Sequence, residues 1–288
     1  MKICIFAPDK IGIILDQEVV DITPLFDALP RPAWPYPQYD WVIRHFADLQ
    51  PQIDEAARTG KRVPLSSLRL QSPVANPGKI IGAPINYRDH IAEANADAEI
   101  NHGKTYTDID QFGLFLKANS SLIGCDEKIR IPFPERRTDP EIELAVVIGR
   151  EAKRVGREKA LDYVFGYCIG LDMTVRGPEF PSFRKSADTF SVLGPWIVTA
   201  DEIPNPNALD LGISVNGALR QKSNTSCLIF NVQRLIEYAS SIYTLYPGDV
   251  IMTGTPAGVG AITFGDVLEA SIDGVGTMSV RIAGREEA

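Results

Sequence analysis

Short runs of apolar or alternating residues dominate the hydrophobic pattern of the chain. Such runs, punctuated by Gly and Pro, are typical of β-strands. The runs that favour strands cover residues 2–6, 11–23, 79–85, 113–119, 129–133, 143–149, 167–175, 196–203, 211–217 and 249–256. Helical spacing of apolar residues is found at residues 41–60, 157–164 and 231–244. Many short strands with few helices predict an α+β fold built on a sandwich-like sheet.

Prolines divide the pattern into two parts. Prolines at positions 30, 32, 35 and 37 predict a loop, because proline fits neither a helix interior nor a central strand. A second proline-rich connector covers residues 62–79. We place a boundary near Pro77, between a small N-terminal β/α domain (residues 1–76) and the main domain (residues 77–288).

Composition and charge exclude several classes of function. The hydrophobic content of 44% is ordinary for a soluble globular protein. A net charge of -8 without any basic run argues against nucleic-acid binding. No segment reaches the ~20 apolar residues that span a membrane. Four cysteines without CxxC spacing predict reduced thiols, and we expect a cytoplasmic protein.

Two acidic residues stand at the head of an apolar strand. Glu141 and Glu143 are two positions apart, so both project from the same face of the strand. Two adjacent like charges need solvent, a retained proton or a cation between them. The run that follows is apolar on both faces, which favours a divalent cation such as Mg²⁺, Mn²⁺ or Ca²⁺. A solvated strand end is the simpler alternative.

Asp172 offers a third ligand. It is a lone acid in the apolar run 167–175, and unpaired buried charges are rare. A turn at this position would account for it equally simply. The chain has three histidines, His45, His90 and His102, without HExxH spacing, which argues against a histidine-rich zinc site.

Seven stretches of the chain carry a further signal when they are taken in order. They cover residues 81–95, 115–124, 139–149, 160–176, 184–203, 211–230 and 244–260. In this order they resemble the fumarylacetoacetate hydrolase family, in particular its smaller bacterial-type, acylpyruvate hydrolase-like members. The resemblance implies a mixed β-sandwich roll of the fumarylacetoacetase C-terminal domain type with a small N-terminal β domain. It also implies a homodimer that binds a divalent cation, usually Mg²⁺, through Glu141, Glu143 and Asp172.

His90 and Glu93 lie three positions apart, a spacing that on a helix puts both side chains on one face. A carboxylate beside an imidazole orients the ring and raises its basicity, which suits activation of water. An ordinary surface pair is the alternative. The resemblance implies that this pair lies on a mobile lid and activates the hydrolytic water, and that Lys185 stabilises an oxyanion.

Four residues are candidate substrate contacts. Arg176 follows Asp172 by four positions and could bind a carboxylate. Thr255 lies in a Gly-rich turn whose hydroxyl and backbone N–H groups suit the same task, although a plain turn explains it equally well. Lys117 matches a family lysine near the metal. Tyr87 precedes the expected lid and serves either packing or substrate contact.

Some positions depart from the family pattern. Gly177 and Glu179 stand where the family usually has Asp and Gln, Pro181 replaces a frequent aromatic residue, and Ala118 replaces a proline. These positions cluster at the expected pocket rim and leave the distal group of the substrate open. Glu179 either disfavours a second substrate carboxylate or points to solvent.

The sequence thus predicts a divalent-metal-dependent hydrolase that cleaves a C–C bond in a 3-acylpyruvate, such as fumarylpyruvate. Decarboxylation of oxaloacetate-like acids and isomerisation of 2-hydroxy-diene-dioates are alternatives on the same site, and neither needs an attacking water. The presence of both His90 and Glu93 favours hydrolysis. A non-catalytic binding protein is a third possibility, against which the complete set of site residues argues.

Overall fold

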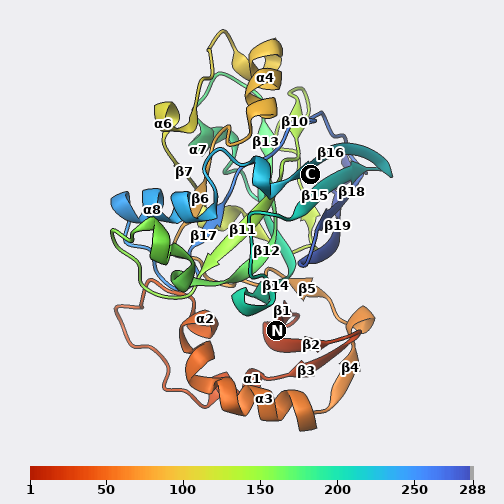
Figure 1. Cartoon of the computed structure of the whole chain (residues 1–288). Helices are drawn as coiled ribbons and strands as arrows, with labels where there is room; N and C mark the ends of the chain where they lie inside the picture. The colour runs from red at the N-terminus through yellow and green to blue at the C-terminus, as the bar shows by residue number, and fades with distance from the viewer. Residues whose placement is uncertain (286–288) are drawn as a thin grey trace.

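A computed structural model describes residues 1–285 and contains one large and one smaller β-sheet with short helices around them (Figure 1). The large sheet is built from β1 (Lys2–Phe6), β2 (Lys10–Leu15), β3 (Glu18–Asp21), β4 (Arg62–Pro64), β5 (Leu70–Gln71), β6 (Ile80–Gly82), β7 (Phe115–Lys117), β8 (Leu122–Ile123), β11 (Ile142–Ile148), β12 (Val164–Asp172), β14 (Ser191–Thr199) and β17 (Val250–Met252). Its order is β4-β3-β2-β1-β14-β12-β11-β17-β6-β7, with β5 beside β1 and β8 beside β14.

The smaller sheet packs against the middle of the large one. It has the order β16-β15-β18-β19-β9. Its strands are β9 (Lys128–Ile129), β15 (Asp210–Val215), β16 (Ala218–Asn224), β18 (Val267–Ile272) and β19 (Gly276–Ile282), and β10 (Thr138–Asp139) pairs separately with β13 (Thr174–Val175). Leu144 of β11 and Leu268 of β18 belong to one buried cluster. This arrangement confirms the predicted α+β fold with a mixed β-sandwich.

The N-terminal strands extend the large sheet. β1 pairs antiparallel with β14, with Lys2 opposite Val198. The proposed boundary near Pro77 lies in the connector between β5 and β6, and the large sheet has strands from both sides of it. The division into two domains therefore stays a prediction.

The N-terminal part of the chain, up to β4, contains three short α-helices. They are α1 (Thr23–Asp27), α2 (Trp41–Phe46) and α3 (Gln50–Thr59), with a 3₁₀ turn at Ala47–Leu49. The predicted single helix over 41–60 is therefore two α-helices, because Pro51 cannot donate the backbone hydrogen bond that a continuous helix needs and instead occupies the first turn of α3.

Four short helices gather at the opposite end, above the mouth of the sandwich (Figure 1). They are α4 (Arg88–Ala96), α5 (Ala98–Asn101), α6 (Ile109–Phe112) and α7 (Pro181–Arg184). The predicted C-terminal helix is α8 (Val232–Ile242). The helix predicted over 157–164 is present as the 3₁₀ helix Arg157–Tyr163, in which Ala160 is buried and Leu161 and Tyr163 pack against the core.

The structure also bears on the thiols and on membrane spans. All four cysteines are free, and Cys227 alone among them is exposed. Burial raises the pKa of the Cys4, Cys125 and Cys168 thiols to about 12, so these three behave as small apolar core residues. Within residues 1–285, the helices are too short or too polar to cross a membrane.

Candidate active site

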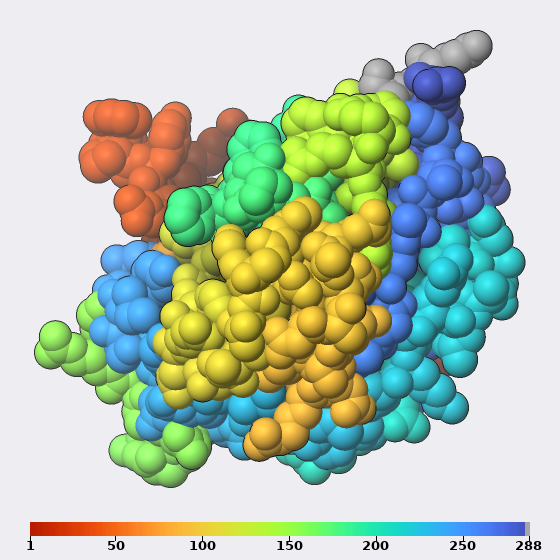
Figure 2. All heavy atoms as spheres, turned by 90° about the horizontal axis from the view of Figure 1, so that it is seen from above, coloured from red at the N-terminus to blue at the C-terminus, as the bar shows by residue number. Residues whose placement is uncertain are grey.

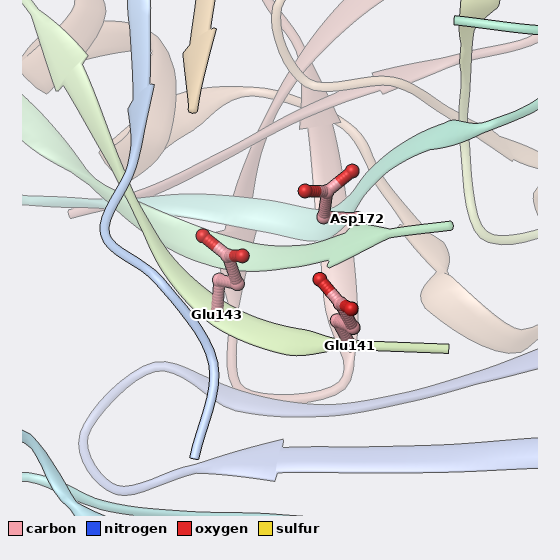
Figure 3. A group of neighbouring side chains, drawn as sticks. All are labelled: Glu141, Glu143 and Asp172. Atoms are coloured by element: carbon pink, nitrogen blue, oxygen red, sulfur yellow. The ribbon is translucent and has the colours of Figure 1, made fainter. Parts of the chain in front are cut away.

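Glu141, Glu143 and Asp172 point into one space at the edge of the paired strands β11 and β12 (Figure 3). The backbone N–H of Asp172 donates to the carbonyl of Glu141 at 2.9 Å, so these two residues stand opposite each other. Glu143, two positions from Glu141, projects from the same face. One oxygen from each of the three carboxylates lies within 4.8 Å of the others. This spacing suits ligands of one cation.

Glu143 accepts fewer hydrogen bonds than Glu141 or Asp172. Only 2% of its surface is exposed. Within residues 1–285 its carboxylate accepts one hydrogen bond, from the backbone N–H of Gly254 to Oε2 at 2.6 Å, and Oε1 accepts none. Burial, followed by the nearby charge of Asp172, raises the pKa of Glu143 well above its ordinary value. A divalent cation would compensate this charge, so the residues present fit one.

Two lysines hold the other carboxylates in place. Lys185 Nζ donates to Glu141 Oε2 at 2.6 Å and to Asp172 Oδ2 and Thr174 Oγ1, both at 2.7 Å. Burial alone would lower the pKa of Lys185, but the carboxylates of Asp172 and Glu141 outweigh it and raise the pKa. Lys117 Nζ donates to Asp172 Oδ1. Lys117 is buried behind Asp172 and is absent from the cavity wall.

Arg176 lines the cavity but is already engaged by the protein. Its Nε donates to Asp139 Oδ2 at 2.7 Å and its Nη2 donates to Glu141 Oε1 at 2.8 Å. Burial would raise the pKa of Glu141, but the charges of Lys185 and Arg176 outweigh it and lower the pKa. No pattern in the sequence indicated Asp139 as a partner of Arg176. Arg176 therefore orients a candidate metal ligand, and its expected role as a clamp on a substrate carboxylate stays a prediction.

His90 and Glu93 lie on helix α4, as their spacing predicted. His90 Nδ1 and Glu93 Oε2 are 2.8 Å apart. Glu93 Oε1 accepts from the backbone N–H of Gly258 at 2.9 Å, which joins α4 to the Gly-rich segment after β17. His90 lines the cavity that also contains the three acids. Since its Nδ1 is held by Glu93, Nε2 is the ring nitrogen that can exchange a proton with a ligand.

Thr255 and Tyr87 occupy different environments. Thr255 lines the cavity, and its Oγ1 accepts from Gln221 Nε2 at 2.8 Å. Gln221 is fully buried and its Oε1 accepts from the backbone N–H of Ile142, so it braces the start of β11. No pattern in the sequence marks Gln221. Tyr87 is buried away from the cavity wall, and its hydroxyl has no hydrogen-bond partner within residues 1–285.

A cavity of about 750 Å³ lies above the acids. Its walls come from the segment before β7, from α4 and from α7. Figure 2 shows the orange and yellow segment that contains α4, α5 and α6 lying across this end of the molecule, beside the green segment that contains α7. Apolar side chains form much of the wall, among them Ile85, Ile100, Phe112, Leu116 and Phe180. The volume and lining are typical of a small-molecule site.

Glu179 lies at the rim of this cavity. Its carboxylate accepts from two nitrogens of Arg136, at 3.1 and 2.8 Å. The hydrogen bond from Arg136 lowers the pKa of Glu179, which therefore stays ionised and paired. The acid at this departure from the family pattern is thus neutralised by a neighbour and presents no free negative charge to a ligand.

Comparison with known proteins places the chain in a family. Residues 79–283 match the family model described as fumarylacetoacetate (FAA) hydrolase C-terminal. The chain is 51% identical over 284 residues to a maleylpyruvate hydrolase of Aquipseudomonas alcaligenes, which covers 98% of this chain and 99% of the relative. The chain therefore belongs to the fumarylacetoacetate hydrolase family.

Solved structures agree with this assignment. A maleylpyruvate hydrolase from Sphingobium sp. SYK-6 is 39% identical, covers 99% of this chain and 100% of its own, and has a TM-score of 0.85. The same enzyme has been solved in complex with manganese(II) ion and pyruvate, with a TM-score of 0.84 over 99% of each chain. A 5-carboxymethyl-2-hydroxymuconate delta-isomerase from Mycobacterium smegmatis, 30% identical, matches with a TM-score of 0.73 over 99% of this chain and 100% of its own.

Proposed function

We propose that the chain is a divalent-metal-dependent hydrolase that cleaves the C–C bond of a 3-acylpyruvate, with maleylpyruvate or a close relative as substrate. The observation that carries the proposal is the meeting of Glu141, Glu143 and Asp172 with the His90–Glu93 pair at one cavity. The maleylpyruvate hydrolases that this chain resembles over almost its whole length support the choice of reaction.

The three acids are the proposed ligands of the cation. Oxygen ligands without histidine or cysteine favour Mg²⁺, with Mn²⁺ or Ca²⁺ possible in the same site. The manganese and pyruvate in the Sphingobium complex agree with a cation that faces an α-keto acid. When bound, the cation acts as a Lewis acid on the carboxylate and keto oxygen of the pyruvoyl end, which eases loss of the acyl group.

The protein's own groups supply the remaining chemistry. Glu93 holds His90 so that Nε2 removes a proton from water, and the oxygen of that water attacks the carbonyl carbon of the acyl group. Lys185, whose three N–H groups contact Glu141, Asp172 and Thr174, stabilises the oxyanion that forms through its positive charge. The C–C bond then breaks, its electron pair remains on the pyruvate carbon, and a proton transferred to that carbon gives pyruvate beside a second carboxylic acid.

The other candidate residues have supporting roles in this proposal. The hydroxyl of Thr255 and the backbone N–H groups of its Gly-rich turn bind the pyruvoyl carboxylate. Lys117 and Arg176 are positioning residues, because each contacts a proposed metal ligand directly. Tyr87 packs beneath the site. Burial, followed by the negative charge of Glu143, raises the pKa of Tyr87, so its hydroxyl stays protonated.

A substrate panel tests the proposal. Purified enzyme with Mg²⁺ or Mn²⁺ is assayed on maleylpyruvate, fumarylpyruvate, oxaloacetate and a 2-hydroxy-diene-dioate. We expect hydrolysis of the acylpyruvates to be fastest, with pyruvate as one product. The isomerase from Mycobacterium smegmatis is a reason to include the diene-dioate. If isomerisation or decarboxylation is faster than hydrolysis, the chain is an isomerase or a decarboxylase instead.

A cytoplasmic homodimer completes the proposal. Large apolar side chains are exposed on the monomer: Trp34, Tyr36, Phe180 and Phe183 have 84, 68, 79 and 54% of their surface accessible. Exposed apolar side chains of this size favour contact with another subunit. Light scattering at micromolar concentration should give twice the monomer mass of 31.6 kDa. A monomeric mass across the concentration range would refute the dimer.

A further inference from the structure

Arg184, the last residue of α7, is a buried cation without an acidic partner. Its side chain lines the cavity and 9% of its surface is exposed. Its Nε donates to the backbone carbonyl of Glu179 at 2.8 Å. An arginine side chain has five N–H donors, and within residues 1–285 no carboxylate pairs with this one. Within the same residues, the two terminal nitrogens of its guanidinium donate to no protein acceptor.

The neighbouring buried cations are all paired. Lys185 and Arg176 each contact Glu141, and Lys117 contacts Asp172. Burial, followed by the charge of Arg176, lowers the pKa of Arg184. A buried charge without a counterion is costly, so an anion in the cavity would stabilise Arg184 as the acids stabilise the other three cations.

The position of Arg184 suggests which anion. Arg184 precedes Lys185 in the chain, and Lys185 contacts two of the proposed metal ligands. Arg184 and the three acids line the same cavity, so one ligand in that cavity can contact both. Much of the remaining cavity wall is apolar, with Ile100 and Phe180 among its residues. A ligand with an anionic group at each end and an unsaturated or aliphatic middle fits this arrangement.

We infer that Arg184 binds a second carboxylate at the far end of the acyl group, and so makes the enzyme selective for 3-acylpyruvates whose acyl chain ends in a carboxylate. The inference rests on the proposed function for the reaction, but the anion site itself is independent of catalysis. The planar guanidinium can donate two parallel hydrogen bonds to a carboxylate, a geometry that a lysine cannot reproduce.

Lys104 is the matched control for Arg184. It is a second cation at the cavity, but it is exposed and its Nζ donates to the carbonyl of Pro178 at 3.3 Å. We compare Arg184→Gln, Arg184→Lys and Lys104→Gln with the wild type. The readout is the ratio of kcat/KM for maleylpyruvate to kcat/KM for acetylpyruvate, whose acyl group ends in a methyl.

Arg184→Gln should lower this ratio about 10- to 150-fold, mainly through KM, since a hydrogen bond to a charged group is lost. Arg184→Lys should recover part of the ratio, and Lys104→Gln should keep the wild-type ratio. An equal loss for both substrates would show a structural role for Arg184 and overturn the inference. An unchanged ratio, or a shift caused by Lys104→Gln alone, would overturn it as well.

A binding experiment separates this inference from the proposed reaction. Calorimetry with Mn²⁺ present compares 2-oxoadipate with 2-oxohexanoate, which has the same chain length but ends in a methyl. The wild type should bind the diacid at least tenfold more tightly, and Arg184→Gln should remove the preference. If the wild type shows this preference but cleaves no acylpyruvate, the reaction is wrong and the anion site stands. If the wild type cleaves maleylpyruvate but Arg184→Gln retains the preference for the diacid, the anion site is wrong.

Discussion

Asp40 and Glu143 are both carboxylates with 2% of their surface exposed, yet their surroundings differ. Asp40 lies just before α2 and accepts four backbone hydrogen bonds of 3.0–3.1 Å, two from residues 42 and 43 and two from residues 75 and 76. Glu143 accepts one, from Gly254. Asp40 thus links the start of α2 to the connector between β5 and β6, whereas Glu143 faces the cavity.

The difference shows that burial of an acid does not by itself mark a functional site. A carboxylate has lone pairs for several donors, and Asp40 has them filled by the backbone. Glu143 has an oxygen without a donor within residues 1–285, next to two further acids. The shortage of donors therefore distinguishes Glu143 from a structural acid such as Asp40. Glu141 and Asp172 have donors on both oxygens, and they are candidate ligands because they lie beside Glu143.

The largest effect should follow from Glu143→Gln. The change removes a charged ligand but keeps the shape, so we expect kcat to fall by about 10³-fold or more as the electrostatic help of the cation is lost. Stability without metal should be unchanged or higher, because repulsion from Asp172 and Glu141 is relieved. Steady-state kinetics and urea unfolding in EDTA measure the two effects.

Glu151→Gln is the control for this prediction, since Glu151 follows the same strand but is exposed. It should leave kcat and stability at wild-type values. A fully active Glu143→Gln enzyme would show that Glu143 is not a ligand of the cation. A stability loss as large as that expected for Asp40→Ala would make Glu143 a structural acid after all.

His90→Ala should reduce hydrolysis by about 10²- to 10⁴-fold, the usual contribution of a general base. The metal should still bind, because the imidazole is bonded to Glu93 and to none of the three acids. Calorimetric titration with Mn²⁺ beside the kinetic assay checks both points. Asp89→Asn, an exposed change on the same helix, should be neutral. Loss of metal affinity in His90→Ala would show that His90 supports the acids rather than the water.

Asp40→Ala tests the other side of the comparison. Four backbone N–H groups lose their acceptor, so the free energy of unfolding should fall by about 2–4 kcal/mol, whereas kcat below the melting temperature should stay near the wild-type value. Urea unfolding and kinetics at 20 °C or lower measure these quantities. Asp27→Ala, an exposed acid in α1, is the control and should unfold like the wild type. A stable but inactive Asp40→Ala protein would contradict the structural role.

The smallest expected effect is the increase in the free energy of unfolding when the metal binds. Binding to the folded state alone adds about 2.7 kcal/mol at a hundred times Kd. The melting temperature of the wild type and of Asp40→Ala should therefore rise by similar amounts when Mn²⁺ replaces EDTA. Glu143→Gln should show little or no rise. A rise in Glu143→Gln equal to that of the wild type would place the cation elsewhere.

Local patterns were enough to predict much of this site. The i, i+2 spacing of Glu141 and Glu143 and the apolar run around Asp172 indicated acids directed to one face, and the i, i+3 spacing of His90 and Glu93 indicated a helical pair. The long apolar runs of β11 and β12 were also predicted. These features depend on neighbours in the chain, which is why the sequence alone could indicate them.

Contacts between distant segments were harder to predict. The strands β16 and β18 were not predicted. One face of each is exposed to solvent, so polar residues such as Arg220, Lys222 and Glu269 interrupt the apolar pattern. Gln221, the link between β11 and the Gly-rich turn, lies in the same polar run. The missing partner of Arg184 could not be predicted either, since pairing depends on which acids the fold brings near.

The central claim is that three carboxylates bind one divalent cation. The most direct test is a crystal of the enzyme grown with Mn²⁺ and pyruvate, measured at the manganese absorption edge. We predict one anomalous peak within about 2.5 Å of an oxygen from each of Glu141, Glu143 and Asp172, with pyruvate beside it. A peak elsewhere, or none at these residues while pyruvate is bound, would contradict the claim.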